Sequence, residues 1–191
     1  MKKSGKTARK TDGNLINKIQ ILAGATALFI GILVYLVDRP PDQTLFIDKS
    51  PVNISLYKIL PNLFGIIGNS LPSFAHVFSF ILITAGLIAS KKSQFIIICL
   101  FWFLIDSIFE LGQKFSTMFI RFIPDWFASI PFLENTGDYF VRGTFSFGDM
   151  AAISIGTIAA YFVLIKTTKK RKGLSCVAAG EEGKELIAQS S

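Results

Sequence analysis

The chain has 191 residues, of which 51% are hydrophobic and 17% charged, and it carries a formal net charge of +7. Average proteins are about 25% charged, so this shortage of charge argues against an ordinary soluble domain. The mean hydropathy of +0.51 also excludes a disordered chain. The two cysteines exclude a disulfide framework, because Cys99 lies in an apolar run and Cys176 near the C-terminus.

Long apolar runs predict the fold class. A bilayer core about 30 Å thick requires about 20 mostly apolar residues in a helix. Four runs meet this requirement, at about residues 19–37, 71–89, 95–113 and 149–165. The first run is longer than the ~7–15 apolar residues of a signal peptide, so we expect an uncleaved anchor. The sequence therefore predicts an all-α membrane protein, a four-transmembrane-helix bundle over residues 19–165.

The Lys and Arg residues predict how the bundle is oriented. Six lie in the N-terminal tail (1–18), two in the short joint between the second and third spans, and six in the C-terminal tail (166–191). Because basic residues favour the cytoplasmic side, we expect both termini to be cytoplasmic. The expected location is the plasma (inner) membrane of a bacterial cell, as a multi-pass protein. The basic tails predict contact with anionic lipid, and the lack of a basic groove with stacking aromatic residues argues against nucleic acid.

The two long connections, 38–70 and 114–148, are then expected on the outer side. Four prolines in the first disfavour long regular structure, and its apolar part, 59–68, is too short to span. We expect that part to lie in the interface or to re-enter the membrane. The second connection is rich in aromatic residues with scattered charges, which suits the headgroup layer. It is either an interfacial cover or a lid over a lipid or ligand cleft.

The third span carries a polar stripe. Asp106, Glu110 and Gln113 stand at i, i+4 and i+7, within an arc of about 60°. An ionisable residue in hydrocarbon costs roughly 2.5–3.5 kcal/mol on insertion scales, so the stripe must face other helices or a wet cavity.

Other polar residues are expected at the same depth. His76, the one histidine, lies about 7.5 Å inside the second span, which is comparable to the depth of about 10 Å expected for Asp106. Asp149 opens the fourth span, and Arg142 precedes it. All these groups are predicted to gather in the outer half of the bilayer.

Small residues repeat at four-residue intervals in two spans. They let helices approach closely, so tight packing is the expected role of Ala152, Gly156 and Ala160, and also of Ala23, Ala27 and Gly31. If the fourth span packs through its small face, Asp149 points into the bundle.

Several kinds of chemistry fit this set of residues. A histidine beside carboxylates can relay protons, and adjacent carboxylates can share one. The chain has no HExxH pair, GxSxG turn or P-loop, so we predict no metal site and no cofactor. No catalytic residue is assigned, although His76 and Glu110 are the candidates for a base. A structural or ligand-binding network, proton or ion handling, and an intramembrane hydrolase or transferase remain open.

The spacing around Glu110 resembles the motif of VanZ-like membrane proteins. Glu110 and Gln113 match the E-x-x-Q element, and Ser146 and Asp149 match S-x-x-D at the head of the next span. Gly156 and His76 also fit this family. The family Asn is replaced by Ile153, Arg142 stands seven rather than six residues before Asp149, and the connection after Gln113 is longer. The resemblance covers about residues 71–165.

The resemblance implies an integral protein of the bacterial cell envelope and supplies no reaction. The leading hypothesis is a non-enzymatic protein whose outer polar cluster binds or positions a small polar or lipid-linked ligand. The predicted cluster comprises His76, Asp106, Glu110, Gln113, Arg142, Ser146 and Asp149.

Overall fold

The computed structural model describes residues 16–40, 56–57, 59, 63–88, 91–131 and 133–188, and it describes side chains as far as residue 168. Every regular element within these residues is helical. In chain order the elements are α1 (Lys18–Asp38), η2 (Gly65–Asn69), α3 (Leu71–Ile88), α4 (Lys92–Lys114), α5 (Ser116–Ile120), η3 (Asp125–Ser129), η4 (Leu133–Asn135), α6 (Thr136–Arg142) and α7 (Phe147–Ala188).

Four helices are long and apolar enough to cross a membrane: α1, α3, α4 and the Phe147–Thr168 part of α7. This confirms the predicted all-helical class with four candidate spans. The fourth helix differs from the expectation, because it begins two residues earlier and continues to Ala188. Most of the predicted C-terminal tail therefore prolongs the helix. Lys, Arg, Ala and Leu are good helix formers, so the change from apolar to basic sequence does not end it.

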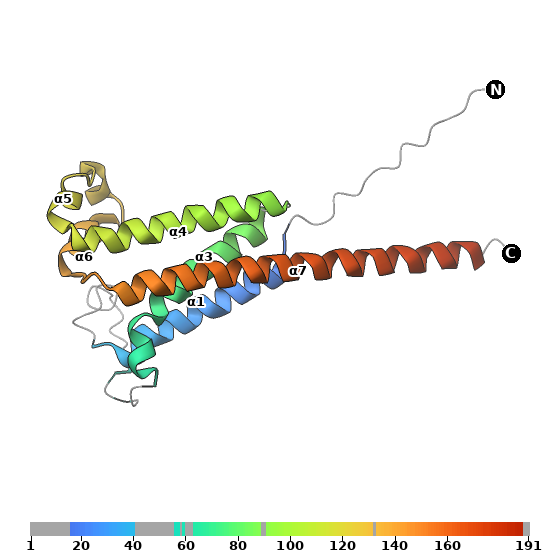
Figure 1. Cartoon of the computed structure of the whole chain (residues 1–191), viewed down its shortest axis with the longest axis horizontal. Coiled ribbons are helices and arrows are strands. Elements are labelled where there is room, and N and C mark those ends of the chain that lie inside the picture. The colour runs from blue at the N-terminus through green and yellow to red at the C-terminus, as the bar shows by residue number, and fades with distance from the viewer. Residues whose placement is uncertain are drawn as a thin grey trace, which may run out of the picture.

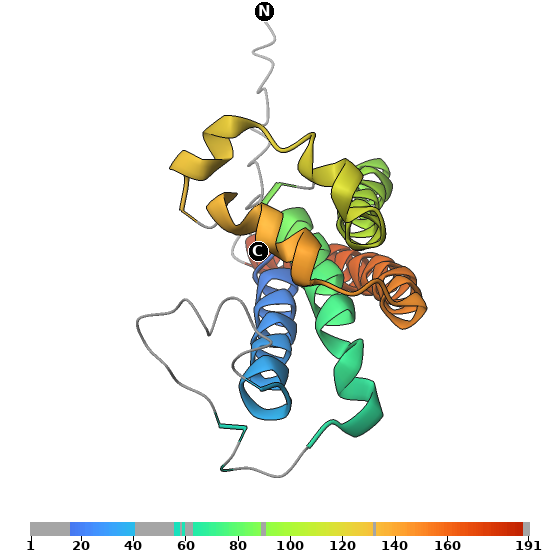
Figure 2. The ribbon, with the colours of Figure 1, turned by 90° about the vertical axis from the view of Figure 1, so that its left-hand side faces the viewer.

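Helix α3 lies at the centre of the bundle and packs against α1, α7 and α4, whereas α1 and α4 have little direct contact. Helix α1 begins at the end of the bundle from which α7 extends (Figure 1). We call this the tail end. At the opposite end, called the α6 end, α5 and α6 lie across the ends of the long helices (Figure 2). This is the end of the bundle at which the sequence predicts the site residues.

Glycines bring α1 against α3. A Cβ atom on Gly24 would stand 2.9 Å from the carbonyl oxygen of Ser79, and one on Gly31 would stand 3.0 Å from the Cβ of Ala75. Gly24 and Gly31 are buried, whereas Ala23 and Ala27 are only partly buried. The predicted stripe on the first span is thus correct for Gly31, but Gly24 takes the place expected of the alanines.

The small face of α7 packs against α3, as predicted. A Cβ atom on Gly156 would stand 2.7 Å from Val77 Cγ1 and 3.0 Å from the carbonyl oxygen of Phe74, and Ala160 is fully buried. Asp149 lies on the same stripe of the helix, seven residues before Gly156. One oxygen of its carboxylate, Oδ1, is buried. The bundle therefore receives Asp149 in the orientation that the sequence predicts.

The connections are held to the ends of the long helices by specific contacts. The Asp38 carboxylate, at the end of α1, accepts hydrogen bonds from the backbone N–H groups of Leu63 (3.0 Å) and Phe64 (2.8 Å), just before η2. The buried ring of Phe140 in α6 lies directly on Gly112 near the end of α4. Residues 60–62, which belong to the apolar segment 59–68, lie outside the described residues. The position of that segment in a bilayer stays a prediction.

Overpacking at Gly24 is expected to weaken the α1–α3 contact. We predict that Gly24→Val lowers the free energy of unfolding by about 1–3 kcal/mol, because the added methyl groups meet the α3 backbone. The matched control is Ala25→Val, on the exposed side of the same helix. Reversible denaturation in detergent measures both variants, and equal stability of the two would contradict the packing described here.

Candidate functional site

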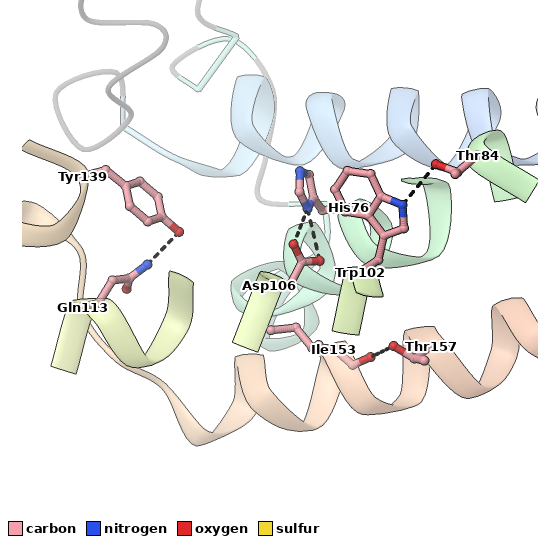
Figure 3. A network of polar contacts seen from close by, with 8 residues as sticks. All are labelled: His76, Thr84, Trp102, Asp106, Gln113, Tyr139, Ile153 and Thr157. Atoms are coloured by element: carbon pink, nitrogen blue, oxygen red, sulfur yellow. Dashed lines mark hydrogen bonds and ion pairs between the residues drawn. The ribbon is translucent and has the colours of Figure 1, made fainter. Parts of the chain in front are cut away.

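The centre of the candidate site is a pair formed by His76 of α3 and Asp106 of α4. The imidazole Nδ1 lies 3.2 Å from one carboxylate oxygen of Asp106 and 3.3 Å from the other (Figure 3). The Asp106 side chain is 8% exposed, whereas that of His76 is 49% exposed. The contact confirms that the two residues, predicted at comparable depth, meet. It leaves one side of the imidazole open.

Aromatic rings hold the histidine from the tail-end side. The ring of Phe80 meets that of His76 edge-on at 4.4 Å between centroids and stacks on Trp102 at 4.7 Å. The indole N–H of Trp102 donates to the Thr84 hydroxyl at 3.0 Å (Figure 3). His76, Phe80 and Thr84 recur every four residues, so they share one face of α3. The orientation of His76 thus depends on a line of contacts between α3 and α4.

Glu110 connects α4 to the start of α7. Its carboxylate oxygen Oε1 accepts the backbone N–H of Ser146 at 2.7 Å, and its side chain is buried. The Ser146 hydroxyl in turn accepts the N–H of Gly148 at 3.1 Å, as an N-cap residue does. The two halves of the sequence motif, E-x-x-Q and S-x-x-D, are therefore in direct contact.

Asp149 occupies the third position of α7. In a capping box, an acidic residue at this position accepts the N–H of the N-cap residue. Here Glu110 holds that N–H, and the buried Asp149 Oδ1 has no hydrogen-bond partner within the described residues. The Asp149 charge acts on Glu110. Glu110 therefore takes the hydrogen bond that a capping box would give to Asp149.

Gln113 contacts the α6 helix rather than the other members of the stripe. Its amide nitrogen donates to the Tyr139 hydroxyl at 2.8 Å (Figure 3). Burial raises the pKa of the Tyr139 phenol to about 12, and the nearby Tyr35 and Glu110 groups add to this increase. The phenol therefore stays neutral over the physiological range and retains a proton to donate. Arg142 ends α6 and is exposed.

Tyr35 and Arg39 were not among the predicted site residues. Tyr35, near the end of α1, interacts electrostatically with Asp149 and Glu110, and the Arg39 guanidinium lies 4.8 Å above its ring. Arg39 also donates to the carbonyl oxygen of Asn69 at 2.8 Å. Tyr35 stands two residues before the end of the first predicted span, so the depth argument used for His76 could also have identified it.

The three residues of the α4 stripe therefore contact three different elements at the α6 end. Asp106 binds α3, Glu110 binds the segment before α7, and Gln113 binds α6. Within the part of the chain that the structure describes, no group of three or more His, Cys, Asp or Glu side chains is placed to hold a metal ion. The arrangement offers hydrogen-bond acceptors and one half-exposed imidazole.

Comparisons with protein-family models, with curated proteins and with solved structures find no match to this chain.

The His76–Asp106 contact is expected to couple α3 to α4. We predict that His76→Ala and Asp106→Ala each lower the free energy of unfolding by about 1–3 kcal/mol, because each leaves one polar group without its partner. The double variant should lose less than the sum, with a coupling energy of about 0.5–3 kcal/mol. Denaturation of all four proteins in detergent completes the cycle. Strict additivity would mean that the pair makes no energetic contact.

The neutral phenol of Tyr139 gives the protein a specific dependence on high pH. Because folding raises the pKa from 10.0 to about 12, the stability that Tyr139 contributes is complete below pH 10 and is lost as the pH rises to about 12. Tyrosinate absorbance should show one phenol that titrates near pH 12, and Tyr139→Phe should remove it. If that component persists in Tyr139→Phe, a different tyrosine is the buried one.

Proposed function

We propose that this protein is a VanZ-like, multi-pass protein of the bacterial plasma membrane, and that it binds or positions a small polar or lipid-linked ligand without chemical conversion. The proposed site lies in the outer half of the bilayer. It is formed by the α6-end cluster, which comprises His76, Asp106, Glu110, Gln113, Arg142, Ser146 and Asp149.

The orientation in this proposal rests on the basic residues. The tail end of the bundle adjoins the basic segments 1–18 and 166–191, and positive charge favours the cytoplasmic side. The α6 end, with its aromatic connection, then lies at the outer surface. The basic tails are expected to contact anionic lipid. The VanZ-like assignment is supported by the hydrogen bond between Glu110 and Ser146, which joins the two motif elements.

One observation carries the proposal: His76 is half exposed although it lies within an apolar helix and is paired with a buried carboxylate. A polar network that served packing alone would enclose its members, since polar groups facing lipid are costly. Because Asp106 contacts Nδ1, the open side of the ring presents the other nitrogen, Nε2. Nε2 is then a preformed hydrogen-bond acceptor beside aromatic rings, which suits a polar ligand that enters from the membrane or its surface.

The same pair also favours a second candidate function, an intramembrane hydrolase or transferase. A carboxylate at Nδ1 fixes the tautomer of a histidine and leaves Nε2 free to act as a base. The two candidate functions predict different results for His76→Gln. This substitution removes the base, so an enzyme loses its activity, whereas a binding protein can still retain its ligand. Turnover of a lipid-linked substrate by the wild type, abolished in His76→Gln, would favour the enzyme.

The binding proposal is tested by the molecules that co-purify with the protein in mild detergent. We expect mass spectrometry to find a polar or lipid-linked species that is enriched over the bulk lipid. His76→Phe retains the ring contact with Phe80 but removes both nitrogens, and it should reduce this enrichment about tenfold through loss of the hydrogen bond.

The matched control is Thr157→Val in α7, whose hydroxyl bonds to its own helix through the carbonyl oxygen of Ile153. It should leave the enrichment unchanged. Equal enrichment in wild type and His76→Phe, with both proteins folded, would refute a ligand site at His76.

A further inference from the structure

The depth of His76 restricts the kind of ligand that it can bind. Helix α3 has 18 residues, so at about 1.5 Å per residue it covers about 27 Å, close to the thickness of the hydrocarbon core. His76 stands about 7.5 Å along the axis from Leu71, the first residue of α3. A helical side chain inclines toward the start of its helix. In the proposed orientation the imidazole therefore lies just inside the outer edge of the hydrocarbon, and the phosphate groups lie outside that edge.

The surroundings of the half-exposed imidazole are apolar. The Phe80 ring meets it edge-on, and Phe109, three residues after Asp106 on the same side of α4, is 41% exposed. Toward the membrane surface, the two isoleucines of η2 are 90% and 72% exposed. Exposed surface of this composition at this depth contacts acyl chains. A ligand that reaches His76 from this side therefore comes from the lipid and carries apolar chains of its own.

The contact with Asp106 defines the hydrogen-bonding character of the exposed ring. A carboxylate only accepts hydrogen bonds, so the Nδ1 atom, 3.2 Å and 3.3 Å from its two oxygens, carries the hydrogen. The Nε2 atom of the neutral ring is then an acceptor. Figure 3 shows it on the side of the ring away from Asp106, and no described residue donates to it. Bulk water is absent from hydrocarbon, so this acceptor requires a donor that lipid supplies.

Among lipid groups, an uncharged hydroxyl meets these conditions. It donates one hydrogen bond, and it enters the edge of the hydrocarbon without the cost of burying a charge. A phosphate or a headgroup ammonium would have to bring its charge past the exposed isoleucines of η2. The ester carbonyls of phospholipids lie at a suitable depth, but they are acceptors and cannot pair with Nε2.

We propose that Nε2 of His76 accepts the hydroxyl hydrogen of an uncharged lipid alcohol, either a diacylglycerol or a single-chain long alcohol. The acyl or alkyl chains lie against the apolar surface beside the ring. Asp106 acts as a positioning residue, because it holds the hydrogen of the ring on Nδ1. The inference rests on the proposed function and names the class of its ligand.

The test uses the full-length protein in nanodiscs of phosphatidylcholine, a lipid without O–H or N–H donors. Equal amounts of dioleoylglycerol, its acetate ester and phosphatidic acid are added. Lipid retained after transfer to mild detergent is measured by native mass spectrometry. We expect dioleoylglycerol to be retained about tenfold over the acetate ester, which has the same chains but no hydroxyl. Equal retention of these two lipids by the wild type overturns the proposal without any variant.

Two variants of His76 locate the hydroxyl. His76→Phe keeps a ring against Phe80 but has no acceptor, so the preference for dioleoylglycerol should disappear. His76→Gln supplies an amide oxygen as acceptor and should retain part of the preference. Thr157→Val, the control for the binding proposal, should retain all of it. An undiminished preference in folded His76→Phe contradicts the assignment.

The remaining outcomes separate the two proposals. Displacement of dioleoylglycerol by oleyl alcohol supports a site for single-chain alcohols, and its persistence supports a diacylglycerol site. If the retained species depends on His76 but is phosphatidic acid or the acetate ester, the ring donates rather than accepts. The lipid alcohol is then wrong while the proposed function stands. If no retained molecule depends on His76, both proposals fail.

Discussion

The cost of a carboxylate in an apolar helix organises the α6 end of this bundle. Asp106 and Glu110 cannot face lipid, so α4 must turn this side toward the other helices. Asp106 meets His76 on α3, and Glu110 meets the backbone before α7. The two residues share one face of α4 but stand about 6 Å apart along its axis, so they reach different neighbouring elements. Together they fix the rotation of α4 against both of its neighbours.

The tail end is organised by the opposite kind of interaction. There, Gly24 and Gly86 bring α1 and α3 close together, and Gln20 donates to Thr167 of α7 at 2.8 Å. The helix backbones approach closely here, and the buried Gln20 side chain finds its partner within the protein. Helices α1 and α4 both pack against α3 but share little contact with each other, and α7 packs against α3 and α4 more than against α1. At the α6 end, by contrast, His76 contacts α4 through Asp106 and remains half exposed.

Much of the fold could be predicted because hydrocarbon thickness sets the length of a spanning helix. The helix boundaries agree with the expected spans to within about three residues, apart from the continuation of α7 to Ala188. Depth arithmetic also placed His76 at a depth comparable to that of Asp106, and the two are in contact. It could not give the lateral direction of each side chain, since depth is independent of rotation about the helix axis. Gln113 was therefore expected in one cluster with Asp106. It binds Tyr139 instead, on the short helix α6, which has no long apolar run from which it could be predicted.

The contact between Glu110 and Ser146 links the structural and the functional interpretations of the cluster. Glu110 accepts the backbone N–H of Ser146, which Asp149 would accept in a capping box. The Asp149 carboxylate is therefore not used to cap α7. A purely structural design would need only one acid at this position, because a single acceptor satisfies the N-cap donor. The second acid adds a like charge to the same region, and its buried Oδ1 accepts no hydrogen bond within the described residues.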